Sequence, residues 1–254
     1  MTDLERIAAA RRAIGLIDLT DLADDHSPGG IDELCRRARE HATAAVCVWP
    51  EFVATCATQL RGTGVRVATV VNFPSGAEPI EVVTVAVAAA LADGADDIDV
   101  VLPYRAVLAG DLDQAAAMVA AVAELIESPT LLKVILETGA LDELAVISSA
   151  AQLAVDNGAD FVKTSTGKIP AGASLGAATA MLDVIAGAGR PVGLKPSGGI
   201  RTFDDAMAYI DLADSVMGEG WASPATFRFG ASGLLDSLLG VIDGDSDVQG
   251  SSSY

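Results

Sequence analysis

Residues 158–168, GADFVKTSTGK, join a segment typical of a buried strand to a segment typical of an anion-binding loop. Phe161 and Val162 belong to the apolar half, which follows a glycine that ends a helical pattern. Lys163 stands at the end of this half, and an ammonium group is rarely buried there without a reason. Thr164–Lys168 are rich in hydroxyl groups and close on Gly-Lys, so they can offer donors to an anion. Lys163 is therefore either an amine nucleophile that acts on a phosphorylated carbonyl compound or a side chain that reaches out to solvent.

The composition restricts the partners of the chain. It has 254 residues, of which 51% are hydrophobic, and a formal net charge of −19. This charge argues against nucleic acids and anionic membranes as partners. Only four of the 16 basic residues are lysines, and all four lie in one third of the chain: Lys133, Lys163, Lys168 and Lys195. Such a distribution favours special roles for these lysines over random surface placement.

The cysteines and the N-terminal segment indicate the compartment. Cys35, Cys47 and Cys56 have no disulfide or metal-type spacing, which is typical of reduced thiols in the cytosol. The first residues, MTDLERIAAARR, lack the apolar core of a signal peptide, and no apolar run reaches transmembrane length. We therefore expect a cytoplasmic protein with no membrane partner.

A short apolar strand followed by an Ala-rich amphipathic helix recurs along the chain. Strands that alternate with helices predict parallel pairing. Three of the intervening helices are expected at residues 78–93, 112–127 and 141–157. The eight expected strands are Gly15–Leu19, Ala44–Trp49, Val65–Val71, Asp97–Leu102, Thr130–Glu137, Ala159–Thr164, Pro191–Lys195 and Phe227–Phe229.

Eight strand–helix units in about 250 residues are the size of a closed barrel. The alternative is an open doubly wound sheet, which usually carries a Gly-rich fingerprint after its first strand. The sequence DLTDL follows the start of the first strand here, with no such glycines. The prediction is an α/β protein with a single (β/α)8 TIM barrel over residues 1–242. An extra N-terminal helix at Asp3–Arg12 precedes the barrel, and a flexible tail rich in Asp, Gly and Ser follows it at residues 243–254.

In such a barrel, functional side chains gather where the strands end. Gly-rich turns follow the seventh and eighth expected strands, at Pro196–Arg201 and Gly230–Gly233, and the second of these opens a helix. Backbone N–H groups of such turns and the N-terminus of a helix commonly hold phosphate. The polar or charged side chains expected at the strand ends are Asp18, Thr20, Cys47, Asp99, Lys133, Glu137, Lys163 and Lys195.

Two lysines at the mouth of one barrel suggest amine chemistry. A free lysine has a pKa near 10.4, so about one in 2,500 is uncharged at pH 7. A second ammonium nearby and partial burial both favour the uncharged amine, which can attack an aldehyde or ketone to form a Schiff base. Asp99 is the carboxylate expected to exchange protons there; the less favoured alternative is a structural counter-ion of one of the lysines, and the two roles can overlap.

Several motifs together resemble one enzyme family, deoxyribose-phosphate aldolase. The most specific are the two that carry the lysines of the expected mouth, and the resemblance extends from Leu16 to Leu239. It implies a metal-free class I aldolase on a (β/α) barrel, without a cofactor, in deoxynucleoside breakdown. Such an enzyme interconverts 2-deoxy-D-ribose 5-phosphate with acetaldehyde and D-glyceraldehyde 3-phosphate. The motifs are DLT (18–20), AAVCVWP (44–50), ATVVNFP (68–74), DVVLPYR (99–105), LKVILETG (132–139), FVKTSTGK (161–168), GLKPSGGIR (193–201) and FGAS (229–232).

The resemblance also implies roles for individual residues. Lys163 would form the Schiff base, Lys195 would favour its uncharged form, and Asp99 would pass protons through a water. Asp18 would order this network, and Tyr254 at the end of the tail would assist proton transfer. Residues expected around the phosphate are Gly167, Lys168, Gly198, Gly199, Ser232 and Gly233, and those expected elsewhere along the substrate are Thr20, Cys47, Thr164, Arg201 and Gly230.

One departure from the family pattern concerns the phosphate site. Many members have Ser-Ser where this chain has Ser232-Gly233. A backbone N–H survives this change and a hydroxyl does not, so we expect weaker phosphate binding. Lys133 and Glu137 are interpreted as a barrel-interior ion pair outside the catalytic set.

Other hypotheses remain open from the residues alone. One is a different Schiff-base barrel, such as a transaldolase-like or keto-acid aldolase, and another is a sugar-phosphate sensor without catalysis. His26 and His41 have no ligand spacing and are expected at the surface, so no metal is predicted. The expected partners are phosphorylated sugars and aldehydes, and a homodimer is the assembly to be tested, although the sequence does not set the oligomeric state.

Overall fold

The computed structural model describes residues 1–25 and 28–244. Eight strands form one sheet in the order β7-β6-β5-β4-β3-β2-β1-β8, and every pair of neighbours is parallel. Each predicted strand overlaps an observed one. The strands are β1 (Ile17–Asp21), β2 (Ala45–Val48), β3 (Arg66–Val71), β4 (Asp97–Val101), β5 (Leu131–Ile135), β6 (Phe161–Lys163), β7 (Gly193–Lys195) and β8 (Phe229–Ala231).

The sheet curves until its two edge strands meet. β1 pairs with β8, and two isolated bridges join the seam between β7 and β8, one from Leu194 to Phe227 and one from Ser197 to Gly230. The result is a nearly closed (β/α)8 barrel, so the predicted TIM barrel is confirmed and the open doubly wound sheet is excluded.

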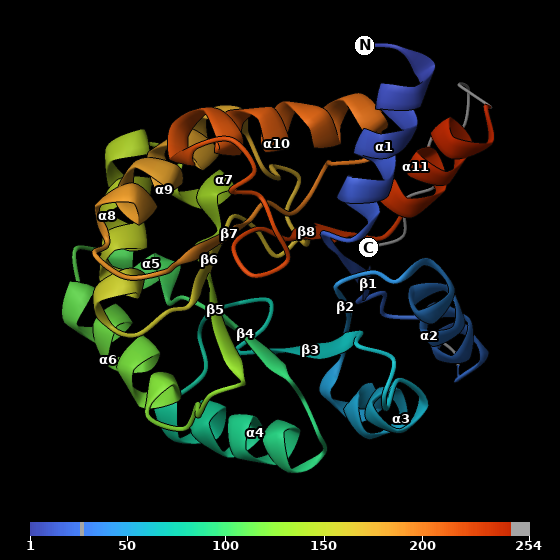
Figure 1. Cartoon of the computed structure of the whole chain (residues 1–254). Helices are drawn as coiled ribbons and strands as arrows, with labels where there is room; N and C mark the ends of the chain where they lie inside the picture. The colour runs from blue at the N-terminus through green and yellow to red at the C-terminus, as the bar shows by residue number, and fades with distance from the viewer. Residues whose placement is uncertain (26–27, 245–254) are drawn as a thin grey trace.

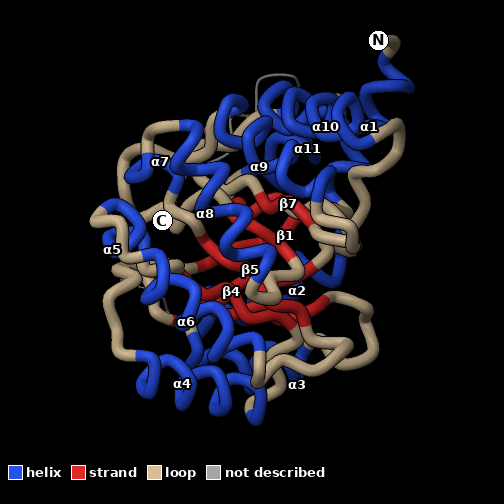
Figure 2. Tube along the Cα trace, turned by 90° about the vertical axis from the view of Figure 1, so that its left-hand side faces the viewer, coloured by secondary structure: helices blue, strands red, loops and turns tan. Residues whose placement is uncertain are grey.

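Helices form an outer layer around the strands, as Figures 1 and 2 show. Together with the 3-10 turn η1 (Pro50–Phe52), they are α1 (Asp3–Ile14), α2 (Pro28–His41), α3 (Val53–Gln59), α4 (Ile80–Ala92), α5 (Tyr104–Leu108), α6 (Leu112–Ala123), α7 (Thr138–Leu141), α8 (Leu144–Asp156), α9 (Leu175–Gly187), α10 (Phe203–Met217) and α11 (Leu234–Asp243).

The apolar stripe of α8 shows how these helices attach to the barrel. Its buried residues Ile147, Ala150, Ala151 and Ala154 follow the i, i+3, i+4, i+7 spacing of one helix face. The predicted single helix at residues 141–157 is wrong at its start. Asp142 has a left-handed backbone (φ 59°), which ends α7 and separates it from α8.

The predicted N-terminal helix is present as α1 and lies beside α11, outside the strands (Figure 1). Thr2 and Glu5 form a capping box at its start, where each side chain bonds the backbone of the other residue. Near its end, the Arg12 guanidinium contacts the Asp214 carboxylate at 2.9 Å and the carbonyl of Ala222 at 2.9 Å. These contacts tie α1 to α10 and to the loop that precedes β8.

The chain beyond α11 lies mainly outside the described residues. α11 ends at Asp243, and the predicted tail overlaps the described chain only at residues 243 and 244. The division into a barrel at residues 1–242 and a tail therefore stays a prediction. Within residues 1–25 and 28–244, no helix combines the length and the apolar character needed to cross a bilayer.

Candidate active site

The barrel interior contains charged side chains because alternate residues of each strand point inward. Asp97 and Asp99 are two residues apart on β4, and both are fully buried. Lys133 on β5 is in register with Asp99. Lys163 on β6 and Lys195 on β7 are in register with each other. Asp99 and Lys133 share one register row, and Lys163 and Lys195 share the row two residues further along the strands, so parallel pairing brings these charged side chains to neighbouring positions inside the barrel.

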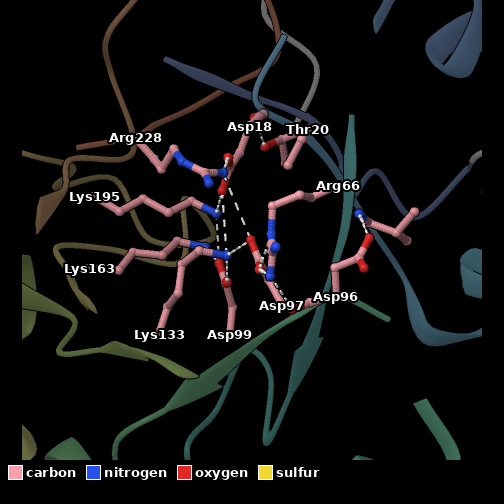
Figure 3. Close-up of polar contacts among 12 residues, drawn as sticks. Asp18, Thr20, Arg66, Asp96, Asp97, Asp99, Lys133, Lys163, Lys195 and Arg228 are labelled. Atoms are coloured by element: carbon pink, nitrogen blue, oxygen red, sulfur yellow. Dashed lines mark hydrogen bonds and ion pairs between the residues drawn. The ribbon is translucent and has the colours of Figure 1, made fainter. Parts of the chain in front are cut away.

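Asp99 lies at the centre of this charged cluster. One of its oxygens, Oδ2, accepts hydrogen bonds from Lys163 Nζ at 2.9 Å and from Lys195 Nζ at 2.8 Å. The other, Oδ1, accepts from Lys133 Nζ at 3.1 Å. Figure 3 shows the ammonium ends of all three lysines converging on this carboxylate. Because Lys163 and Lys195 share one oxygen, their nitrogens lie close together, as the two-lysine hypothesis requires.

Asp18 and Asp97 extend the cluster across the barrel. Asp18 contacts Lys195 Nζ at 2.6 Å and the guanidinium of Arg228 at 2.8 Å. Asp97 contacts Lys133 Nζ at 2.6 Å and the guanidinium of Arg66 at 2.6 Å. The ion pairs of the cluster therefore join three carboxylates to five cationic side chains. This excess of positive charge favours the loss of a proton from one of the cations.

The pKa shifts show which members of the cluster stay charged. Burial raises the pKa of Asp99, but Lys133, Lys163 and Lys195 outweigh burial and hold that pKa well below its ordinary value. Burial lowers the pKa of Lys195, but Asp18 and Asp99 outweigh it and raise that pKa well above the ordinary value. The pKa of Lys133 is likewise raised, by Asp97 and Asp99 against burial. Lys133 and Lys195 are therefore ammonium ions beside an ionised Asp99.

The pKa of Asp18 follows the same logic. Burial raises it, but Lys195, Lys133 and Arg228 together bring it below the ordinary value. Asp18 is therefore also an ionised member of the cluster.

Lys163 differs from the other two lysines in its partners. Among the described residues it forms one ion pair, to Asp99, whereas Lys195 forms two and Lys133 forms three. Lys163 is thus the lysine of the cluster with the fewest carboxylate partners among the described residues.

Gly230 gives the lysines room inside the barrel. A Cβ at this position would lie 3.2 Å from Cε of Lys195 and 2.1 Å from Oγ of Ser197. The sequence predicts Gly230 as a substrate-binding residue, which stays a prediction; the structure shows that a side chain at this position would collide with Ser197 and crowd Lys195.

The loops after β6, β7 and β8 are joined to one another. Thr164 Oγ1 donates to the carbonyl of Ser197 at 3.1 Å and accepts from the Ser197 N–H at 2.9 Å. The N–H of Gly230 donates to the carbonyl of Pro196 at 3.0 Å. Gly167, Gly198 and Gly199 have left-handed φ values of 82°, 87° and 84°, a conformation that glycine adopts without strain. Gly233 is the N-cap of α11 and follows Ser232, so this helix N-terminus opens beside the joined loops.

Lys168 is the predicted phosphate-binding residue whose side chain points elsewhere. Its ammonium contacts the Asp24 carboxylate at 3.1 Å and lies 5.8 Å from the ring centroid of Trp49. Asp24 belongs to the loop after β1 and is 86% exposed. The Lys168 side chain therefore reaches across to the β1 and β2 side of the barrel.

The other predicted residues fall in different places. Thr20 is buried, and its hydroxyl donates to the carbonyl of Asp18 at 2.8 Å. Cys47 is fully buried on β2, and burial raises the pKa of its thiol. Arg201 is exposed, and its backbone N–H donates to the Asp205 carboxylate at 3.0 Å. Tyr254 and His26 lie outside the described residues, and His41 is half-buried on α2.

One predicted contact is wrong. Lys133 does not pair with Glu137: Lys133 contacts Asp97 and Asp99, whereas Glu137 accepts hydrogen bonds from Thr166. The two residues lie four positions apart along the chain, and Lys133 lies deeper in the barrel, in register with Asp99.

Sequence analysis missed Asp97, Arg66 and Arg228 as members of the cluster. Asp97 had a usable signal, because it stands two residues before Asp99 on the same predicted strand. Arg66 and Arg228 also lie within predicted strands, but the side of the sheet to which they point depends on the register. Among residues 1–25 and 28–244, no group of three or more His, Cys, Asp or Glu side chains is arranged to hold a metal ion.

Comparison with known proteins places this arrangement in a class. The model of the DeoC/LacD family aldolases matches residues 12–239. The chain is 47% identical over 249 residues to a deoxyribose-phosphate aldolase of Agrobacterium fabrum strain C58, covering 97% of this chain and 96% of that one. The fold and the family define a barrel aldolase, an enzyme of the lyase class.

Solved structures agree with this class. The deoxyribose phosphate aldolase of Aeropyrum pernix, described as a unique tetrameric structure, aligns with a TM-score of 0.78 at 25% identity, covering 94% of each chain. A structure described as QR15, an aldolase, aligns with the same TM-score at 27% identity, covering 91% of this chain and 96% of that one. The chain belongs to the DeoC/LacD aldolase family.

Proposed function

We propose that this enzyme reversibly cleaves 2-deoxy-D-ribose 5-phosphate to acetaldehyde and D-glyceraldehyde 3-phosphate through a Schiff base on Lys163. The observation that carries the proposal is the set of ion pairs around Asp99. Three lysines share this carboxylate, and Lys163 is the one with a single ion pair among the described residues. The name of the Agrobacterium relative supports the substrate.

The first steps take place at the aldehyde carbon, C1. The uncharged amine of Lys163 adds to the carbonyl and forms a carbinolamine, whose hydroxyl takes up a proton and leaves as water to give an iminium ion. Lys195 stays charged beside it because Asp18 and Asp99 raise its pKa. Its positive charge disfavours a second ammonium on Lys163 and so keeps the nucleophile available.

The carbon–carbon bond then breaks between C2 and C3. The C3 hydroxyl gives up its proton, C3 becomes the aldehyde of D-glyceraldehyde 3-phosphate, and the electron pair of the C2–C3 bond moves to the iminium to leave an enamine. Protonation at C2 and addition of water release acetaldehyde and regenerate Lys163. We assign the proton transfers to Asp99 acting through a water, with Asp18 ordering the network and Tyr254 assisting protonation at C2.

The phosphate end of the substrate is assigned to the joined loops. Gly167, Gly198 and Gly199 have left-handed φ values there, and we assign their backbone N–H groups as donors to the phosphate, while the N-terminus of α11 at Gly233 adds the positive end of a helix dipole. Lys168 would leave Asp24 to contact the phosphate. Thr20, Cys47, Thr164 and Arg201 stay predictions as substrate contacts, as do the role in deoxynucleoside breakdown and the cytoplasmic location.

The proposed function is tested by incubating the enzyme with 2-deoxy-D-ribose 5-phosphate and measuring the acetaldehyde that is released. We expect the wild type to produce equal amounts of the two aldehydes and Lys163→Met to lose at least about a thousandfold in kcat, about 4 kcal/mol in the barrier. Lys168→Met is the matched control, which loses a lysine of the same mouth and keeps turnover at a raised KM. Cleavage of 2-keto-3-deoxy acids, without cleavage of 2-deoxy-D-ribose 5-phosphate, would favour a keto-acid aldolase. Binding of 2-deoxy-D-ribose 5-phosphate without turnover would favour a sugar-phosphate sensor.

A further inference from the structure

Glu137, at the end of β5, is a buried carboxylate that the mechanism above does not use. Its side chain is fully buried, and it forms no ion pair with any described side chain. Its backbone is left-handed, with φ 59° and ψ 57°, which is rare for a residue that carries a side chain. Both features are unfavourable in isolation, so the contacts of Glu137 have to compensate for them.

The hydrogen bonds of the Glu137 carboxylate go to Thr166, in the middle of the loop that follows Lys163. The carboxylate accepts a hydrogen bond from the Thr166 N–H at 3.2 Å and another from the Thr166 hydroxyl. Thr166 is itself buried, and its Oγ1 accepts the Lys168 N–H at 3.1 Å. A chain of hydrogen bonds therefore runs from Glu137 through Thr166 to the backbone of Lys168.

A neighbouring contact holds the start of the same loop. The Thr138 N–H donates to the carbonyl of Thr164 at 2.8 Å. Residues 137 and 138 thus fix the loop at two points, which explains why the backbone turns to a left-handed conformation there. Burial raises the pKa of Glu137 above its ordinary value, and the two hydrogen bonds from Thr166 act in the opposite direction.

The loop connects two parts of the proposed active site. Lys163, the amine that attacks C1, stands at its beginning, and Gly167 and Lys168, assigned to the C5 phosphate, stand at its end. A change of about 1 Å in the distance between these parts would misplace the C3 hydroxyl relative to the group that accepts its proton when the C2–C3 bond breaks.

We infer that Glu137 is a positioning residue, which sets the distance between the Schiff-base lysine and the phosphate donors through Thr166 and so makes the enzyme prefer phosphorylated substrates. The inference rests on the proposed function. It concerns the use of the phosphate and leaves the chemistry at C1 unchanged.

The test compares 2-deoxy-D-ribose 5-phosphate with 2-deoxy-D-ribose as substrates of the full-length enzyme. Glu137→Gln keeps the shape of the side chain but can accept through only one oxygen. We expect kcat/KM to fall at least about tenfold for the phosphorylated sugar and less than about threefold for the unphosphorylated one. Inhibition by inorganic phosphate should weaken in parallel, because the same donors bind it.

Two Thr166 variants keep the test decisive if Glu137→Gln does not fold. Thr166→Val removes the hydroxyl that joins Glu137 to Lys168 and should reproduce the selective loss. Thr166→Ser keeps that hydroxyl and should retain the wild-type ratio between the two substrates.

Equal losses on both substrates, or no loss on either, would overturn the positioning role. A wild type that releases no acetaldehyde from either sugar would instead overturn the proposed function, so the two failures are distinguishable.

Discussion

The number of carboxylate partners distinguishes the three lysines of the barrel at the scale of single residues. Lys133 is held by Asp97 at 2.6 Å and Lys195 by Asp18 at 2.6 Å, whereas the closest carboxylate of Lys163 is Asp99 at 2.9 Å. Removing a proton from Lys133 or Lys195 would therefore sacrifice more ion-pair energy inside a medium of low dielectric constant. This difference is our reason for placing the nucleophile at residue 163.

The pH dependence of catalysis tests the role of Lys195. Replacing Lys195 by Leu removes a charged neighbour that favours the free amine on Lys163. We expect the activity of Lys195→Leu to fall at neutral pH and to recover partly in alkaline solution, so that the pH optimum moves upward. Lys163→Leu should stay inactive at every pH. Rates measured from pH 6 to 10 give both profiles.

Loss of Lys195 also leaves Asp18 and Asp99 with one cation fewer, so the melting temperature of the variant has to be measured beside its rates. A folded Lys195→Leu with the pH profile of the wild type would refute the electrostatic role of this lysine.

Single residues also show what the sequence could and could not predict about the site. Lys163 and Lys195 were predictable as neighbours because they stand at or next to the ends of consecutive predicted strands, and Asp99 because it lies on another strand of the same predicted barrel. The contact between Arg228 and Asp18 joins the residue directly before β8 to β1, at opposite ends of the chain, so it exists only once β8 closes against β1. The carboxylate partners of Lys133, Asp97 and Asp99, could not be predicted because they depend on how deep in the barrel that lysine lies.

Strands β6 and β7 show how the elements create space for charged side chains. Gly193 begins β7 opposite Phe161 of β6, and a Cβ at position 193 would lie 2.2 Å from the Phe161 ring. The aromatic ring therefore fills the space that a side chain of residue 193 would need. This packing supports the level at which Lys163 and Lys195 lie, two residues further along each strand.

Replacing Gly193 by Ala should destabilise the barrel, because the new methyl group has to displace the Phe161 ring. We expect the free energy of unfolding in urea to fall by about 1–3 kcal/mol. The control is Gly187→Ala at the end of α9, where a Cβ meets no atom within 4 Å and the helix gains about 0.5–1 kcal/mol. Equal free energies of unfolding for the two variants would show that the packing of the Phe161 ring does not require a residue without a side chain at position 193.

The prediction of elements from sequence succeeded where periodicity carries the information. All eight strands and the leading helix were predictable because buried parallel strands are continuous apolar runs between Ala-rich helices. The break between α7 and α8 was not, because it depends on the left-handed backbone at Asp142, which no hydrophobic pattern marks.

At the scale of the whole molecule, an acidic chain contains a local cluster in which cations are in excess. The chain has a formal net charge of −19, while cations outnumber carboxylates five to three in the cluster around Asp99. The barrel therefore concentrates positive potential where an anionic substrate and a neutral amine are both needed. The homodimer stays a prediction, since the single chain does not test it.

Borohydride reduction in the presence of acetaldehyde, followed by peptide mass mapping, tests the Schiff base on Lys163 most directly. Acetaldehyde condenses with the reactive amine, and reduction converts the iminium into a stable ethylamine. We predict an ethyl group on the peptide that contains Lys163 and unmodified Lys133, Lys168 and Lys195. An adduct on Lys195 in place of Lys163, or no adduct on an enzyme that cleaves 2-deoxy-D-ribose 5-phosphate, would contradict the mechanism.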